Sequence, residues 1–533
     1  MLTNQNLHAR ITKDLLLSAH RRCIMKKFFG VFLMVVLLSF IISCGGGEAD
    51  LRSQTLIVAM SSDAITMDPS AQNDAYSANA MMQMYEGLIA ITPDNEVVPA
   101  LAEKYDISSD GMEYTFYLKK GVKFHNGEEL KAGDVVFSYL RACASPAVAH
   151  IFSDIDPDTI KAVDDYTVKF RMKAPYAGIL TALCHSSAHI VNKKAVEAAG
   201  DQYARNPIGT GPYKFVSHTK SDKIKFERYE EYQGKKPYYK YLEFRIIPEP
   251  TNRIIELESG GADIVYDVSP NDLDRFTGNN EIKLIRSFDY LTQYMGMNCG
   301  KPPLDDIRVR QAIACAVDTD QIVKAVWKGL GRTASGPYAP AIRYSIANKL
   351  KPIPRDVEKA KKLLKEAGYE SGLKIRLSTN ERTERIDMAV IMKEQFKDVG
   401  IDLSIEVLEW SKYIEMLEKG EQQLFEIGWS SDTPDPDMVV YPCFHSISRG
   451  PGGNYVFLSD PELDELIIKG RRVLDGPERA NVYEQIQERI MYLTPAIFQY
   501  NGEQAAGIRS NITGLRLSPL GHHFLGNIKP VDK

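Results

Sequence analysis

Residues 356–429 decide the fold class, and they read DVEKAKKLLKEAGYESGLKIRLSTNERTERIDMAVIMKEQFKDVGIDLSIEVLEWSKYIEMLEKGEQQLFEIGW. Asp356 is a preferred helix N-cap residue, apolar side chains follow at helical spacing as far as Ala367, and Gly368 provides a stop. Strands are then expected at 373–377, 401–407 and 425–429, with helices at 386–399 and 413–417. This alternation predicts an α/β domain whose strands are connected by helices.

The first half of the chain contains further strand patterns. The segment 55–60 reads TLIVAM, and 113–118, 167–172 and 223–227 alternate polar with apolar residues, as half-buried strands do. The turn-rich segment 206–212, NPIGTGP, separates the last of these strands from the preceding ones. We therefore expect a domain boundary near this segment.

The stretch GWSSDTPDPD at 428–437 directly follows the strand expected at 425–429. Aspartate and proline are turn formers, so one interpretation is a solvated loop behind the strand. In α/β domains, however, ligand-binding loops gather at the carboxyl ends of strands. The second interpretation is a binding site in which Trp429 forms one wall and a carboxylate receives a cation. The residues alone leave both interpretations open.

Composition indicates a folded, multidomain chain. With 533 residues, 44% of them hydrophobic and 25% charged, the chain is long enough for several domains of ordinary size. Its 65 basic and 70 acidic residues give a net charge of -5. Nucleic-acid binding needs a concentrated basic surface, so we expect no nucleic-acid partner.

The N-terminal region has the pattern of an export signal. From Met25 two lysines precede a mostly apolar run, 28–42, that is shorter than a membrane span and is followed by SCGGG. We expect a signal peptide at 25–43 and a flexible tether at 44–54, and we expect 1–24 to be a misassigned extension. A transmembrane anchor and an unusually long leader are the alternatives. The segment 41–44, IISC, resembles the lipobox of bacterial lipoproteins, which implies that Cys44 is acylated.

Motifs for catalysis or metal binding are missing from the sequence. It contains no HExxH, GxxxxGK[ST] or GxSxG pattern, and its five cysteines beyond Cys44 are scattered without a CxxC pair. One disulfide is compatible with export, and the odd number leaves at least one thiol free. We expect no enzyme activity, no cofactor and no metal site.

Several sequence blocks resemble the bacterial extracellular solute-binding proteins of family 5, the peptide/nickel class. The blocks are 99–105 with 109–127 (PALAEKY, SDGMEYTFYLKKGVKFHNG), 134–138 (DVVFS), 206–213 (NPIGTGPY), 301–312 (KPPLDDIRVRQA), and 428–429 with 432–437 (GW, DTPDPD). They occur in the expected order over nearly the whole mature chain.

The resemblance implies a periplasmic-binding-protein-like type II α/β fold with two lobes, a hinge and an extra inserted domain. Lobe I is expected at 55–83, 203–288 and 498–533, the inserted domain at 84–202, and lobe II at 289–497. Two aromatic-rich crossing segments, 290–294 and 496–500, are expected to form the hinge, with Tyr294 and Gln499 at the site. Closure around a ligand is then a population shift.

The resemblance also implies a set of peptide-binding residues. Asp432 matches the aspartate that neutralises the ligand's α-ammonium in peptide-binding relatives, and the backbone of Gly428, Trp429, Ser430 and Ser431 can pair with a peptide main chain. Trp410 is expected to pack on the ligand, with packing in the protein core as the alternative. Arg382 and Arg385 are both candidates for the ligand carboxylate, and pairing with Glu381 and Glu384 at the surface is the alternative.

The functional expectation is an extracytoplasmic, lipid-anchored, monomeric protein that captures di- to oligopeptides and delivers them to the permease and ATPase of an ABC importer. The alternatives are the same fold with another solute, such as a nickel chelate or glutathione, and a sensor or adhesin without transport.

Overall fold

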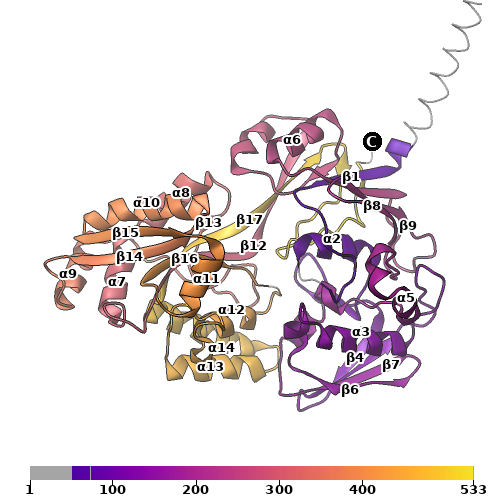
Figure 1. Ribbon diagram of the computed structural model, residues 1–533, viewed down its shortest axis with the longest axis horizontal. Coiled ribbons are helices and arrows are strands. Elements are labelled where there is room, and N and C mark those ends of the chain that lie inside the picture. Colours follow the sequence, from indigo (N-terminus) through magenta and orange to yellow (C-terminus); the bar gives the residue numbers. More distant parts are fainter. Residues whose placement is uncertain (1–50, 72–73, 432, 532–533) are drawn as a thin grey trace, which may run out of the picture. The chain divides into compact units, whose positions relative to one another are not determined.

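Two long antiparallel strands, β12 (Ile282–Met297) and β17 (Ala496–Arg509), run side by side through an eleven-stranded mixed sheet (Figure 1). The computed structural model describes residues 51–71, 74–431 and 433–531. The order of the sheet is β15-β14-β16-β12-β17-β11-β1-β10-β9-β8, and β13 pairs with β17 outside this path. Both β12 and β17 therefore contribute to each half of the sheet.

The half of the sheet beyond β17 is called lobe I. Its strands are β1 (Thr55–Met60), β8 (Tyr213–Thr219), β9 (Lys223–Arg228), β10 (Tyr241–Ile246) and β11 (Ile264–Val265). Helix α6 (Pro250–Ser259) packs Ile254 and Leu257 into the apolar core of this lobe. Burial of such side chains is the main force that holds helix and sheet together.

The half beyond β12 is called lobe II. Its strands β14 (Leu373–Asn380), β15 (Ile401–Leu408) and β16 (Leu424–Trp429) are parallel to one another, whereas β16 is antiparallel to β12. The helices of this half are α7 (Ile307–Ala316), α8 (Thr319–Trp327), α9 (Val357–Glu366), α10 (Thr383–Lys397), α11 (Trp410–Glu418), α12 (Asp437–Phe444), α13 (Pro461–Arg472) and α14 (Pro477–Leu493).

A separate four-stranded antiparallel sheet, β4-β5-β7-β6, lies between β1 and β8 in the sequence. Its strands are β4 (Ala102–Ile107), β5 (Glu113–Leu118), β6 (Ile155–Asp164) and β7 (Thr167–Met172). The neighbouring elements are β2 (Ile89–Ile91), β3 (Val97–Pro99), α2 (Ala75–Met84), α3 (Ala132–Ala144), α4 (Ile179–Ala182) and α5 (Lys193–Ala199). The remaining short strands are β13 (Arg332–Thr333), β18 (Ile512–Thr513) and β19 (Lys529–Pro530).

The elements expected from the sequence are present. Strands β1, β5 and β7 have the expected bounds, and helix α9 begins after Asp356, whose side chain accepts a hydrogen bond from the Lys359 backbone N–H. Gly368 follows the helix with φ of 88°, in the left-handed region that favours glycine. The strand–helix alternation of residues 373–429 therefore predicted the local structure correctly.

The two segments expected to cross between lobes pair with each other. Thr292 lies opposite Asn501, Gln293 opposite Tyr500, and Tyr294 opposite Phe498, with a register shift after Gln293. Such a shift bends a strand and increases its twist. This irregularity is consistent with the role of a hinge in a two-lobed fold.

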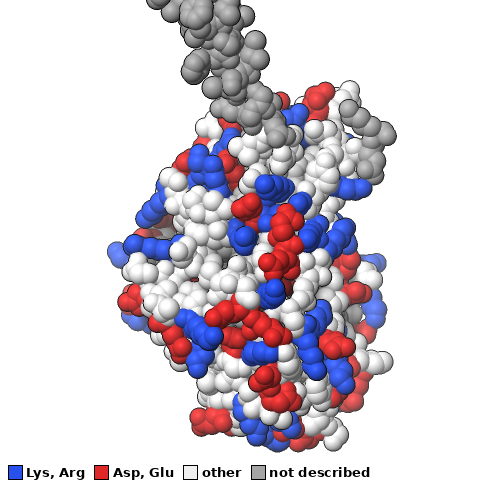
Figure 2. Space-filling view, turned by 90° about the vertical axis from the view of Figure 1, so that its right-hand side faces the viewer, with Lys and Arg blue, Asp and Glu red and all other residues white. Residues whose placement is uncertain are grey.

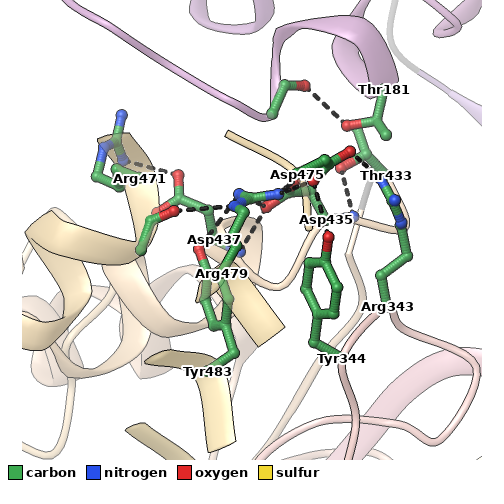
Figure 3. Close-up of polar contacts among 12 residues, drawn as sticks. Thr181, Arg343, Tyr344, Thr433, Asp435, Asp437, Arg471, Asp475, Arg479 and Tyr483 are labelled. Carbon is green, nitrogen blue, oxygen red and sulfur yellow. Dashed lines mark hydrogen bonds and ion pairs between the residues drawn. The ribbon is translucent and has the colours of Figure 1, made fainter. Parts of the chain in front are cut away.

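The described residues 431 and 433–437 after β16 are buried, so the interpretation of this stretch as a solvated loop is wrong. Asp435 and Arg479 are both 0% exposed and form a two-point ion pair with N–O distances of 2.7 and 2.9 Å (Figure 3). Asp437 is also buried and pairs with Arg471 at 2.8 Å. Burial raises the pKa of Asp437 to about 7, against the lowering effect of Arg471.

The five cysteines of the described residues are free thiols: Cys143, Cys184, Cys299, Cys315 and Cys443. The single disulfide that export allows is therefore not formed among them.

Prediction on stability. Asp435→Asn leaves the buried Arg479 guanidinium without its two-point partner, so the free energy of unfolding should fall by about 3 kcal/mol. Chemical denaturation measures this change. Lys365→Gln is the matched control, because Lys365 and its partner Glu370 are exposed and their loss should leave stability unchanged. Equal effects of the two substitutions would contradict a structural role for the buried pair.

Candidate functional site

The sequence-predicted residues of lobe II meet where β14 and β16 end beside β12. Strand β14 ends at Asn380 and continues through a short turn into α10, while β16 ends at Trp429, opposite Thr292 of β12. Helix α11 begins nearby with Trp410. Ligand sites of open α/β sheets form at such carboxyl ends of parallel strands.

Arg385 lies on the inner face of α10. It shares this face with Met388, Ala389 and Met392, at spacings of three, four and seven residues, and these side chains pack toward the sheet. The Arg385 side chain is consequently only 6% exposed. Arg382, one turn earlier, is exposed, pairs with Glu384 at 3.0 Å and lies over the Trp327 ring.

The polar partners of the Arg385 guanidinium are neutral amides. Its Nη1 donates to Asn380 Oδ1 at 3.0 Å and its Nε donates to Gln293 Oε1 at 3.4 Å. The guanidinium also lies 5.9 Å from the Trp410 ring centroid. No carboxylate in the described part of the chain forms an ion pair with it. Burial lowers the pKa of Arg385, the expected result for a desolvated cation without a direct counterion.

Glu426 lies at the centre of the same region and is 0% exposed. Its Oε1 accepts a hydrogen bond from Gln499 Nε2 at 2.7 Å, and its Oε2 accepts one from Gln293 Nε2 at 3.1 Å. Burial raises the pKa of Glu426 to about 7, although both hydrogen bonds and the charge of Arg385 lower it. Gln293 thus connects Arg385 to Glu426 through its amide group.

Gly428 is required by close packing over this network. A Cβ atom at this position would lie 2.9 Å from both Gln293 Oε1 and Leu291 Cδ1, and 3.7 Å from Arg385 Nη2. The backbone of β16 therefore approaches the guanidinium directly, which places two predicted site residues together.

The two tryptophans differ in their surroundings. Trp410 is the first residue of α11, whose N-cap Glu409 accepts from the backbone N–H groups of Ser411 and Lys412, and its side chain is 47% exposed. The alternative of core packing for Trp410 is therefore wrong. Trp429 is half-buried, and its Nε1 donates to the Met438 carbonyl at 2.9 Å, which fixes the start of the following loop.

The remaining predicted residues are distributed over and beyond this region. Gln499 contacts Glu426, whereas Tyr294 is buried among aromatic side chains that include Phe425 and Phe498. Ser430 is exposed, and the buried Ser431 donates through Oγ to the Thr433 carbonyl at 2.6 Å. Asp432 and Cys44 lie outside the described residues.

Glu426 and Gln293 were missed by sequence reasoning. The available signal was a glutamate in the middle of the otherwise apolar strand LFEIGW, because a carboxylate inside a strand buried on both faces needs hydrogen-bond donors. The sequence does not indicate which donors these are.

The surface carries charges of both signs (Figure 2). Figure 2 shows basic and acidic side chains interspersed over the face in view. Among the residues that the structure describes, no helix combines the length and the apolar composition needed to cross a bilayer.

Comparison with known proteins identifies the family. Residues 96–450 match the model of bacterial extracellular solute-binding proteins, family 5 Middle. The chain is 32% identical to the dipeptide-binding protein of Escherichia coli (strain K12) over 85% of this chain and 90% of that protein. It is 30% identical to the glutathione-binding protein GsiB of Pectobacterium atrosepticum, over 87% and 91% respectively.

Solved structures show the same fold. HbpA2 from Haemophilus parasuis matches with a TM-score of 0.84 and 27% identity, over 90% of this chain and 100% of that chain. The periplasmic binding protein DppA from Helicobacter pylori, in complex with the peptide STSA, matches with a TM-score of 0.73 and 29% identity, over 89% and 98%. The periplasmic-binding-protein-like, two-lobed α/β fold is therefore confirmed, and the chain belongs to the family 5 bacterial extracellular solute-binding proteins, which are extracytoplasmic substrate-binding transport proteins.

Proposed function

We propose that this protein captures peptides outside the cytoplasm and delivers them to an ABC importer. The observation that carries the proposal is Arg385, a nearly buried cation whose polar partners among the described residues are neutral amide oxygens. A buried charge is costly without a partner, and a peptide C-terminal carboxylate supplies one with favourable geometry. The exposed ring of Trp410 beside it offers an apolar surface to the adjacent side chain.

The edge of β16 supports binding of a peptide main chain. Strand β14 pairs with β16 only at Leu424 and Phe425, whereas β12 pairs with β16 as far as Trp429. Within the described residues, the edge of 427–429 that faces away from β12 has no strand neighbour. Such an edge recognises a peptide through backbone hydrogen bonds, independently of its side chains. In this arrangement Asp432 receives the peptide ammonium.

Contacts between lobe II and the four-stranded sheet region support a closing motion. Arg471 of α13 lies 3.6 Å from Asp154, its guanidinium lies 5.1 Å from the Tyr176 ring centroid, and its carbonyl accepts from the Ala177 N–H at 3.0 Å. These contacts lie outside the Arg385 region and join segments distant in sequence. They stabilise the closed arrangement, and a ligand that binds only this arrangement increases its population.

The same proposal includes the domain boundaries, the lipid anchor, the oligomeric state and the transporter partners. We retain the lobe and inserted-domain boundaries at 55–83 with 203–288 and 498–533, 84–202, and 289–497. We also retain a lipid anchor at Cys44, a monomeric state, the absence of enzyme activity, and partnership with a permease and an ATPase.

Calorimetry with the wild-type protein tests the ligand class. A panel of di-, tri- and longer peptides is compared with glutathione and with a nickel–histidine complex. Binding of several unrelated peptides supports the proposal, whereas heat from glutathione alone, from the nickel complex alone, or from none of them would overturn it.

Prediction on the ammonium contact. Asp432→Asn removes a charge-assisted hydrogen bond, so the Kd for peptides should rise at least tenfold, which corresponds to about 1.4 kcal/mol. The measurement is calorimetric titration with the best peptide of the panel. Unchanged affinity would show that the ammonium is held by another group.

Prediction on the carboxylate contact. Arg385→Gln should raise the Kd for a peptide with a free C-terminus by about tenfold to a hundredfold, because a hydrogen bond to a charged group is lost. The C-terminally amidated form of the same peptide should be affected much less. Arg382→Gln serves as the matched control, since Arg382 is exposed and paired with Glu384. A loss that is the same for acid and amide would exclude this role for Arg385.

Prediction on closure. Asp154→Ala removes the ion pair with Arg471 while leaving the lobe II region around Arg385 intact, so peptide affinity should fall by about twofold to fivefold. Asp156→Ala, two residues along the same chain segment, should leave affinity unchanged. Small-angle scattering of the ligand-free variant should show a larger radius of gyration. An unchanged radius and an unchanged Kd would argue against a closing role for this contact.

A further inference from the structure

Arg385 and Glu426 are bridged by the Gln293 amide, and binding of a ligand carboxylate would change the net charge of this buried pair. In the absence of ligand, one buried cation and one buried carboxylate share Gln293, whose Oε1 accepts from Arg385 and whose Nε2 donates to Glu426. A ligand carboxylate on Arg385 would introduce a second negative charge into the same buried region. Two carboxylates and one guanidinium leave a net negative charge that the surroundings must compensate.

The surroundings of Glu426 contain no second cation in the described part of the chain. Arg385 on α10 and Tyr413 on α11 interact electrostatically with it, and Arg385 in turn interacts with Tyr294 on β12 and with the exposed Arg382. Burial raises the pKa of both tyrosines well above the usual range, so both are neutral near pH 7. Tyr413 donates its hydroxyl hydrogen to the Glu426 backbone carbonyl at 2.7 Å and not to the carboxylate.

The site can accommodate a protonated Glu426. A carboxylic acid needs an acceptor for its hydrogen, and Gln499 Oε1 is buried beside it without a hydrogen-bond partner among the described residues. Rotation of the Gln499 amide by half a turn exchanges its Nε2 and Oε1, so the carbonyl oxygen then faces Glu426. The same two glutamines therefore satisfy the ionised form and the neutral form.

We propose that Glu426 takes up one proton from solvent when a ligand carboxylate binds Arg385. Peptide capture is thereby linked to proton uptake, and Glu426 is a positioning residue that acts through Arg385. This inference rests on the proposed function and deepens it. The O–H bond forms on a Glu426 carboxylate oxygen, the ligand carboxylate pairs with Arg385, and the net charge of the buried region stays at zero. Release of the peptide returns the proton to solvent.

The direction of the pH dependence follows from linkage. The pKa of Glu426 without ligand is raised to about 7, and a bound carboxylate raises it further. Below about pH 7 the residue is already protonated in the free protein, so affinity is independent of its titration. Above that pH, each binding event must bring a proton, and affinity falls as pH rises.

The test is calorimetry at pH 7 in two buffers of different ionisation enthalpy, which gives the protons taken up per peptide bound. A peptide with a free C-terminus is compared with its C-terminal amide. Both peptides carry the ammonium group, so its contribution cancels in the difference between them. Wild type should take up about half a proton more with the acid than with the amide, because about half of Glu426 is ionised at this pH. Between pH 7 and pH 8 the Kd for the acid should rise about fivefold more than the Kd for the amide.

Two variants separate this linkage from a purely structural role. Glu426→Gln should abolish the acid–amide difference in proton uptake and in pH dependence. Glu86→Gln is the matched control, because Glu86 is a half-buried glutamate elsewhere that accepts hydrogen bonds from Tyr232 and Thr210 and whose pKa is also raised by desolvation. It should retain the wild-type difference.

The possible results distinguish failure of this inference from failure of the proposed function. Wild-type binding of peptides without an acid–amide difference in proton uptake overturns this inference alone, and so does a difference that persists in Glu426→Gln. Failure of wild type to bind any peptide overturns the proposed function and this inference with it. The acid–amide comparison needs only wild-type protein, so it remains decisive even when Glu426→Gln does not fold.

Discussion

The pairing of β12 with β17 is the constraint on which the rest of the structure depends. The two strands belong to both halves of the large sheet, so each lobe is built on backbone that continues into the other. Their register shift after Gln293 provides the bend that a hinge needs. The same strands place one glutamine each, Gln293 and Gln499, against a single carboxylate of β16. Any relative motion of the lobes that bends these strands therefore acts directly on the hydrogen bonds of Glu426.

Two buried arginines of lobe II differ in their partners, and this difference is the basis for proposing that one is structural and the other binds a ligand. Arg479 makes a two-point pair with Asp435 and also contacts Asp475, so both of its terminal nitrogens donate to carboxylates of the protein. Arg385 contacts neutral amide oxygens and reaches its counter-charge only through Gln293. A direct two-point pair is satisfied within the fold, whereas a bridged pair retains unused attraction for an anion. The two residues have the same side chain and nearly the same burial, and only their partners distinguish them.

Sequence signals that act over a few residues predicted the helices and strands, whereas the distant partners of the buried carboxylates were not predicted. Helices and strands were predicted correctly from the N-cap Asp356, the stop at Gly368 and the spacing of apolar residues in 373–429. These signals act within a few residues. The burial of Asp435 and Asp437 was missed, since their partners Arg479 and Arg471 lie 44 and 34 residues away in the sequence. The donors to Glu426 lie 133 and 73 residues away. The sequence left Arg382 and Arg385 open as candidates, and the structure distinguishes them, because only Arg385 shares the inner face of α10 with Met388 and Met392.

In the proposed mechanism, the segment from Gly428 to Asp437 connects the region around Arg385 to the closing contact. At one end Gly428 lies against Arg385 and Gln293, and at the other Asp437 holds Arg471, which meets Asp154 and Tyr176. Between these ends Trp429 and Asp435 are fixed by Met438 and Arg479, so the described part of the segment is anchored at several points. A segment fixed in this way transmits no large movement of its own. Ligand binding and closure are then coupled because both sets of contacts need the same arrangement of the lobes, and each stabilises it independently. Under the proposed function, this coupling by a shared state is the reason that the closing contact should affect affinity without touching the ligand.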